Sequence, residues 1–94
     1  MTKLELCRNE IDSIDEEIIK LYEKRMEIVK EVINYKLDNN IEILDTSREE
    51  KMLNKNLVKI SNEEYKKYYK DVLTGFLKAS KEMQKDILNA KKDN

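Results

Sequence analysis

The fold of this chain is decided by residues 4–37, LELCRNEIDSIDEEIIKLYEKRMEIVKEVINYKL. Apolar side chains recur in this stretch at alternating spacings of three and four residues, which predicts one long helix with a single apolar stripe. The stripe consists of Leu4, Cys7, Ile11, Ile14, Ile18, Leu21, Ile28, Val32 and Tyr35. Because the stretch contains neither Gly nor Pro, we expect the helix to run unbroken for about 34 residues, or roughly 51 Å.

The expected helix is too long for the rest of the chain to cover. A compact protein of 94 residues has a radius of gyration of only about 12 Å. The helix should therefore project beyond its own fold and leave part of its apolar stripe bare. A second copy of the chain is the simplest partner for that stripe, so we expect an intertwined homodimer that forms a helical bundle.

A turn and a short second helix are expected after the long one. The polar residues 38–40 favour a turn, because Asn tolerates the left-handed conformation that ends helices. The second helix should begin within residues 45–47, where Thr46 and Glu49 match a capping box, and should end near Lys59.

A third, long helix completes the expected fold. Residues 61–64 form another capping box, and the apolar residues that follow again recur every three or four positions. They are Tyr65, Tyr69, Val72, Phe76, Ala79, Met83 and Ile87. With no Pro, one Gly and 41% charged residues, the chain is predicted to be a single all-α domain over residues 1–94, with helices in the order long, short, long.

Composition excludes several classes of function. Nineteen basic and twenty acidic residues leave no basic face of the kind that nucleic acids need. The chain has no His and one Cys, so neither a metal site nor a metal cofactor is expected. A single Cys and the lack of a long apolar run predict a soluble, cytoplasmic protein without a membrane segment.

Several polar residues stand out by their spacing. Arg25 interrupts the apolar stripe of the first helix, where a cation is costly unless a partner meets it. Lys36 follows it by about three turns on the same face, some 16 Å away. Two further groups each share a helix face by their i, i+3 or i, i+4 spacing. These groups are Asp45, Arg48 and Glu49 in the second helix, and Ser80 and Gln84 in the third.

Arg8 lies too far from Arg25 for both to hold one small molecule within a single chain. Arg8 precedes Arg25 by seventeen positions, which correspond to about 25 Å along the helix and a rotation of about 100°. In an antiparallel pair of such helices, however, Arg8 of one chain approaches Arg25 of the other. A shared site of this kind would occur twice per dimer.

Each of these residues also has a purely structural interpretation. Arg25 can pack its stem against apolar neighbours and extend its head into water. Glu49 can serve only the capping box and Asp45 only the helix start, while Ser80 and Gln84 can be surface residues. Taken one by one, these residues support nothing beyond a helical oligomer.

The order of these residues resembles the AroQ-class chorismate mutases, all-helical enzymes that convert chorismate to prephenate. The resemblance extends from Cys7 to Gln84 and rests on five segments. They are Arg8-Asn9-Glu10-Ile11-Asp12-Ser13-Ile14-Asp15, Glu23-Lys24-Arg25, Tyr35-Lys36, Asp45-Thr46-Ser47-Arg48-Glu49 and Ser80-Lys81-Glu82-Met83-Gln84. It implies a single chorismate mutase type II domain, without a cofactor, that serves aromatic amino acid biosynthesis.

The resemblance also implies roles at the reacting atoms. Lys36 and Gln84 would be the catalytic residues, because in this family they donate hydrogen bonds to the ether oxygen of chorismate. Arg25, together with Arg8 of the partner subunit, would bind the two carboxylates through the planar guanidinium fork.

The remaining substrate contacts implied by the resemblance come from the last two helices. Glu49 would bind the ring hydroxyl, helped by the backbone near Asp45. Arg48 would lie alongside, and Ser80 would assist at a carboxylate.

Three other functions stay open at this stage. Isochorismate-pyruvate lyase uses a similar anionic pocket on the same fold. A helical dimerisation module would have no chemistry at all. Finally, a mutase of this family can act as a regulated partner of another enzyme of the shikimate pathway.

Overall fold

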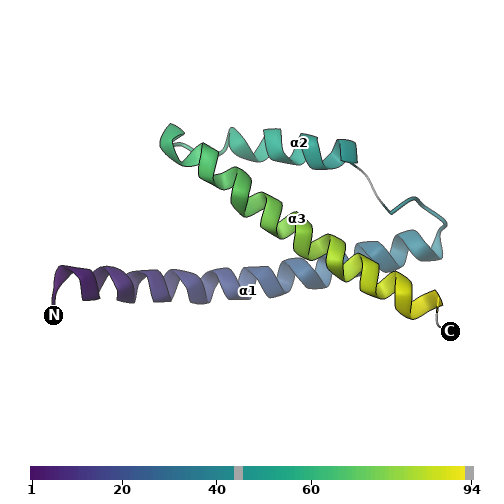
Figure 1. Ribbon diagram of the computed structural model, residues 1–94, viewed down its shortest axis with the longest axis horizontal. Helices are drawn as coiled ribbons and strands as arrows, with labels where there is room; N and C mark the ends of the chain where they lie inside the picture. The colour runs from purple at the N-terminus through teal and green to yellow at the C-terminus, as the bar shows by residue number, and fades with distance from the viewer. Residues whose placement is uncertain (44–45, 93–94) are drawn as a thin grey trace.

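The computed structural model describes residues 1–43 and 46–92. It contains helices α1 (Lys3–Asp38), α2 (Thr46–Leu57) and α3 (Glu63–Lys92), and no strand within these described ranges (Figure 1). The all-α prediction and the long, short, long order are therefore confirmed. The first helix matches its expected range to within one residue at each end. The second ends at Leu57, two residues before the predicted Lys59.

The helix ends are capped largely where the turn chemistry predicted. At the start of α1, the hydroxyl of Thr2 accepts a hydrogen bond from the backbone N–H of Glu5 at 3.1 Å. At its end, the Asn39 side chain donates to the Tyr35 carbonyl at 2.8 Å, and Asn40 takes the left-handed conformation with φ 55°. Two consecutive Asn residues thus stop the helix, as expected for residues that tolerate this conformation.

The start of α3 differs from the prediction. Its cap is Asn62, whose side-chain oxygen accepts from the Glu64 N–H at 2.9 Å. The predicted capping box paired Ser61 with Glu64, but an Asn one position later satisfies the same N–H and shifts the helix start to Glu63. The other predicted box involves the side chain of Thr46, which lies outside the described part of the structure.

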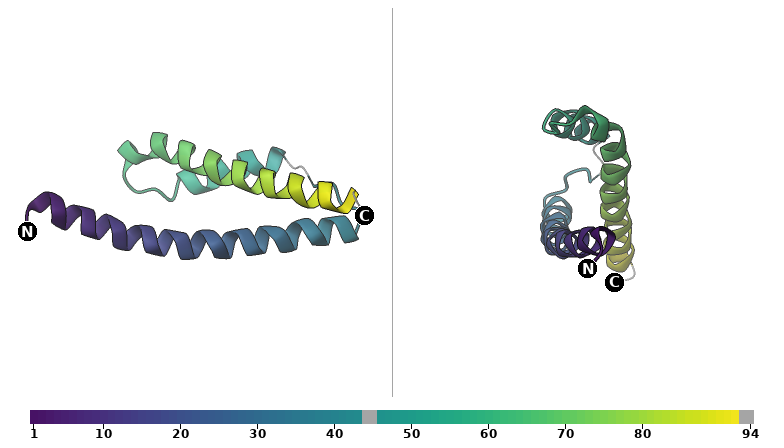
Figure 2. Two further views of the ribbon diagram at one scale, coloured as in Figure 1. Left: turned by 60° about the horizontal axis from the view of Figure 1, so that its bottom comes forward. Right: turned by 90° about the vertical axis from the view of Figure 1, so that its left-hand side faces the viewer.

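The three helices form an open, elongated arrangement. Helix α3 crosses the C-terminal half of α1, and α2 packs on α3 (Figures 1 and 2). The N-terminal end of α1 extends beyond both (Figure 1). The chain measures 56 × 28 × 15 Å, with a radius of gyration of 17.1 Å instead of the roughly 12 Å of a compact domain of this length. The first helix therefore projects beyond its own fold, as its length predicted.

The core of the single chain is very small. Within the described residues only Ile33 and Leu73 are buried hydrophobic side chains, each 3% exposed. The apolar stripe on the N-terminal half of α1 is uncovered, with five side chains between 47% and 65% exposed: Leu4, Ile11, Ile14, Ile18 and Leu21. A continuous apolar stripe of this length is unusual on the surface of a soluble monomer.

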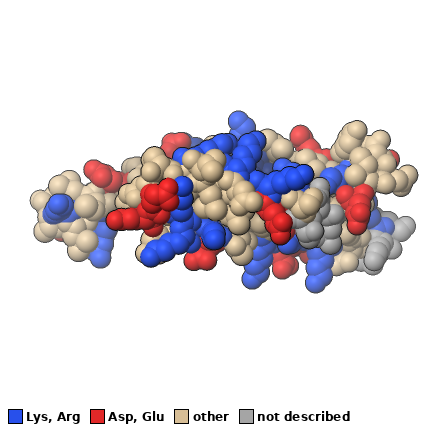
Figure 3. Space-filling model, turned by 90° about the horizontal axis from the view of Figure 1, so that it is seen from above, with Lys and Arg blue, Asp and Glu red and all other residues tan. Residues whose placement is uncertain are grey.

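The outer surface is strongly charged but mixed in sign. Figure 3 shows basic and acidic side chains interspersed over one face of the molecule. No helix in the described part of the chain combines the length and the apolar character that a bilayer-spanning segment requires.

Candidate functional site

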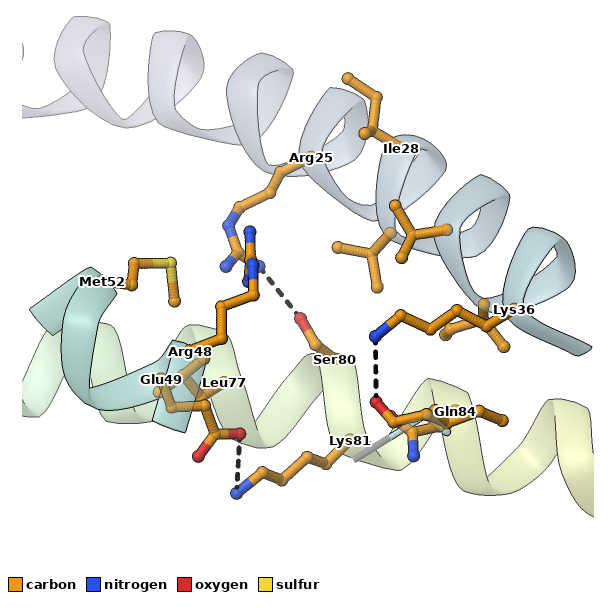
Figure 4. A pocket seen from close by; sticks show the side chains of 14 residues that line it. Arg25, Ile28, Lys36, Arg48, Glu49, Met52, Leu77, Ser80, Lys81 and Gln84 are labelled. Atoms are coloured by element: carbon orange, nitrogen blue, oxygen red, sulfur yellow. Dashed lines mark hydrogen bonds and ion pairs between the residues drawn. The ribbon is translucent and has the colours of Figure 1, made fainter. Parts of the chain in front are cut away.

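A cavity of about 580 Å³ lies between the three helices. This volume is within the range of about 300–1,000 Å³ that is typical of small-molecule sites. Its apolar wall comes mainly from α1, where residues at three–four spacing face α3. The apolar lining residues are Ile28, Val29, Val32, Ile33, Ile43, Met52 and Leu77. The polar lining residues project from all three helices into the same space (Figure 4).

The structure brings together six of the eight residues that the sequence singled out. These six line the cavity: Arg25, Lys36, Arg48, Glu49, Ser80 and Gln84. Arg8 does not line it; it is exposed on the projecting half of α1. Asp45 lies outside the described residues.

Arg25 is held against α3 and does not extend into bulk water. Its Nη1 donates to the Ser80 hydroxyl at 3.0 Å, and its guanidinium lies over the Phe76 ring, 5.5 Å from the centroid. Ser80 in turn donates to the Phe76 carbonyl at 3.0 Å. Both partners of Arg25 are uncharged, so its positive charge is positioned without being neutralised.

Lys36 and Gln84 face each other across one end of the cavity (Figure 4). The Lys36 ammonium, half-buried, donates to the backbone carbonyl of Ile43 at 3.3 Å. This bond folds the segment after α1 back over the cavity. Ammonium has three donors, so Lys36 keeps donors for a ligand.

The α2 helix contributes two charged side chains to the cavity. Arg48 projects from α2 into the space that the Arg25 head also enters (Figure 4). Glu49 forms an ion pair with Lys81 of α3, with 3.1 Å between Oε1 and Nζ. Lys81 also lines the cavity but was not among the predicted site residues.

A signal for Lys81 was present in the sequence. Leu77, Ser80, Lys81 and Gln84 fall at i, i+3, i+4 and i+7, which places them on one helix face. Two of these four residues were already candidates, so the face itself marked Lys81 as a neighbour of the site. What periodicity alone does not supply is its partner, because Glu49 belongs to another helix.

The polar lining of the cavity is strongly positive. Among the described lining residues, four cations stand against one carboxylate, an excess of three positive charges. Within the described part of the chain, neither Arg25 nor Lys36 has a carboxylate partner. Cations in an apolar cleft that lack an anionic partner attract a small anion, and guanidinium groups suit a carboxylate in particular. The geometry therefore favours a small molecule with more than one negative charge.

Comparison with known proteins points to one family. The family model described as chorismate mutase type II matches residues 7–85, a range that includes Arg8 and all of the described cavity lining. The chain is also 42% identical over 50 residues to the bifunctional chorismate mutase/prephenate dehydratase of Buchnera aphidicola subsp. Acyrthosiphon pisum (strain APS). That match covers 53% of this chain and 13% of the relative.

The ring beneath Arg25 provides a test of the site. Phe76→Leu keeps an apolar side chain but removes the aromatic face, which contributes about 0.5–1 kcal/mol to holding a partly exposed cation. We expect the concentration of a small dicarboxylate that half-saturates the cavity to rise roughly two- to fivefold. Tyr68→Leu is the matched control, since that ring also lies under a cation, Lys67, at 5.0 Å but outside the cavity. Equal effects of the two substitutions, measured by titration, would contradict this role of Phe76.

Proposed function

The chain belongs to the chorismate mutase type II family, and we propose that it catalyses the intramolecular Claisen rearrangement of chorismate to prephenate, in aromatic amino acid biosynthesis. The observation that carries this proposal is the convergence of Arg25, Lys36, Arg48 and Gln84, from three different helices, on one cavity. Chorismate is a small dicarboxylate, and the excess of positive charge on the lining is suited to such a ligand.

The proposed roles begin with the two carboxylates of the substrate. Arg25 binds one of them, held in place by Ser80 and Phe76. Arg48, which enters the same space (Figure 4), lies alongside. Guanidinium and carboxylate form two parallel hydrogen bonds, which fixes the orientation of the substrate as well as adding affinity.

The proposed reaction needs charge stabilisation at a single atom. One C–O bond breaks while one C–C bond forms within the same molecule, so no proton has to be transferred and no covalent intermediate forms. Negative charge develops on the ether oxygen as its bond lengthens, and Lys36 and Gln84 are the proposed donors to that oxygen. Loss of one such preorganised donor costs about 2.7–4 kcal/mol in well-studied sites.

Positioning supplies the other part of the proposed catalysis. The enolpyruvyl arm of chorismate has to lie over the ring before the new bond can form. Holding two reacting groups in that geometry contributes up to about 7–11 kcal/mol in favourable intramolecular cases. The closely spaced apolar side chains of α1, together with Arg25 and Arg48, are suited to this task. Glu49 is proposed to accept a hydrogen bond from the ring hydroxyl, helped by the backbone near Asp45.

We further propose that the working unit is a homodimer. The exposed stripe from Leu4 to Leu21 needs a partner, and an antiparallel second α1 presents a matching stripe. In this arrangement Arg8 of each chain reaches the cavity of its partner and binds the second carboxylate. A dimer of this type has two equivalent sites, each completed by both chains.

The direct test is to incubate the purified protein with chorismate and to follow the loss of its ultraviolet absorbance, with identification of the product. We expect prephenate. Isochorismate, assayed in parallel, should not release pyruvate at a comparable rate. If chorismate remains unchanged at micromolar protein, the chain is not a mutase.

The donor role of Gln84 predicts a pH dependence in a variant. Gln84→Glu can donate to the ether oxygen only while its carboxyl is protonated, which for an ordinary Glu holds below about pH 4.3. Above that pH the carboxylate repels the developing negative charge. We therefore expect activity that falls as pH rises, to about one hundredth of wild type at pH 8.

Asn89→Glu is the control for this variant, because it adds the same carboxyl to an exposed position of α3 outside the cavity. It should leave the pH profile of wild type unchanged. Full activity of Gln84→Glu at pH 8 would refute the donor role.

The shared site predicts complementation between two inactive variants. Arg8→Ala and Arg25→Ala should each be nearly inactive, since each removes a carboxylate ligand from both sites. In a hybrid dimer, one site regains both arginines and the other lacks both. After subunit exchange in an equal mixture, half of the dimers are hybrids, so about one quarter of wild-type activity should return. Recovery is measured after exchange has been verified with mass-labelled chains, and its absence would rule out sharing.

A further inference from the structure

The only carboxylate among the described cavity-lining residues is Glu49. It shares the cavity with Arg25 and Arg48, which the proposed function places at a carboxylate of the substrate. A carboxylate near guanidinium groups forms strong, charge-assisted hydrogen bonds with them. If it were free to turn toward these cations, Glu49 would compete with the substrate.

Lys81 holds the Glu49 carboxylate on the side of the cavity away from the heads of Arg25 and Arg48. Its Nζ lies 3.1 Å from Glu49 Oε1, with the Glu49 side chain 25% exposed and the Lys81 side chain 48% exposed. Figure 4 shows Glu49 turned toward Lys81 and away from the heads of Arg25 and Arg48. The pair therefore satisfies the one acidic group among the described lining residues, while the Arg25 guanidinium, whose partners are uncharged, faces the cavity.

The same ion pair ties α2 to α3. Within the described ranges α2 packs on α3, and its backbone does not come close to that of α1. Toward its other end, α2 is linked to α3 by the hydrogen bond from Asn56 Nδ2 to the Tyr69 hydroxyl, at 3.1 Å. The pair of Glu49 and Lys81 is thus the corresponding link at the N-terminal end of α2, next to Arg48.

We propose that Lys81 is a positioning residue for substrate binding: it holds Glu49 at the hydroxyl-binding side of the cavity and prevents it from occupying the cations that bind the substrate carboxylates. The inference rests on the proposed function. Because competition for these cations weakens binding of substrate and transition state alike, its loss should change KM and leave kcat nearly unchanged.

The test compares chorismate kinetics of wild type with Lys81→Met, Lys81→Arg and the control Lys78→Met. Lys78 is exposed and lies about 60° further from the cavity-lining face of α3 than Lys81 does. We expect Lys81→Met to raise KM about fivefold, the upper range for a partly exposed ion pair, with kcat changed less than about twofold. Lys81→Arg should have the KM of wild type, and Lys78→Met should match wild type in both KM and kcat.

The dependence on Glu49 is tested in a double-mutant cycle. In a Glu49→Gln background the competing charge is absent, so Lys81→Met should change KM by less than about twofold. An equal KM increase in both backgrounds, or an Lys81→Met variant that behaves like Lys78→Met, would overturn the proposal. A fall in kcat alone would also overturn it.

Failure of the proposed function has a different signature. If wild type does not convert chorismate, the proposed function fails. The same set of variants is then compared by the dissociation constant for chorismate, measured by calorimetric titration, because KM is no longer measurable. The same fivefold increase and the same cancellation in the Glu49→Gln background would still support the positioning role. A wild-type chain that neither converts nor binds chorismate would overturn both.

Discussion

A single cation in an apolar stripe determines how this site is built. Arg25 occupies a position of α1 where the pattern of the helix calls for an aliphatic side chain. Its removal from water has to be compensated, and the compensation comes from the Ser80 hydroxyl and the Phe76 ring on α3. Because both are uncharged, the guanidinium is held in one orientation with its charge still available. A carboxylate on α3 in place of these two partners would have stabilised the packing of α1 on α3, but it would have neutralised the guanidinium and left no positive charge there for an anion.

Much of the fold was predictable from the sequence, because the residues that form and end each helix are close together in the sequence. Alternating three–four spacing defined α1 and α3, and Asn at positions 39 and 40 stopped α1 by a property of the residue itself. Six of the eight residues that the sequence singled out also line one cavity. The cap of α3 was misplaced because Ser61 and Asn62 are both good caps, and sequence alone does not rank two adjacent candidates.

The sequence did not predict which residues of different helices contact one another. Which lysine pairs with Glu49 depends on where and at what angle α2 packs on α3, which periodicity does not encode. The partners of Arg25 were hidden for the same reason, since Ser80 lies fifty-five residues away along the chain. For Arg8 the missing information is larger still, because its proposed place depends on a second chain.

Helix α3 packs against both α1 and α2. Its three polar cavity residues, Ser80, Lys81 and Gln84, lie within about one and a half turns of each other. Any axial displacement of α3 relative to α1 would therefore move these three side chains together. A displacement of α3 by a single residue, about 1.5 Å along its axis, would change all the contacts that this wall of the cavity makes with α1.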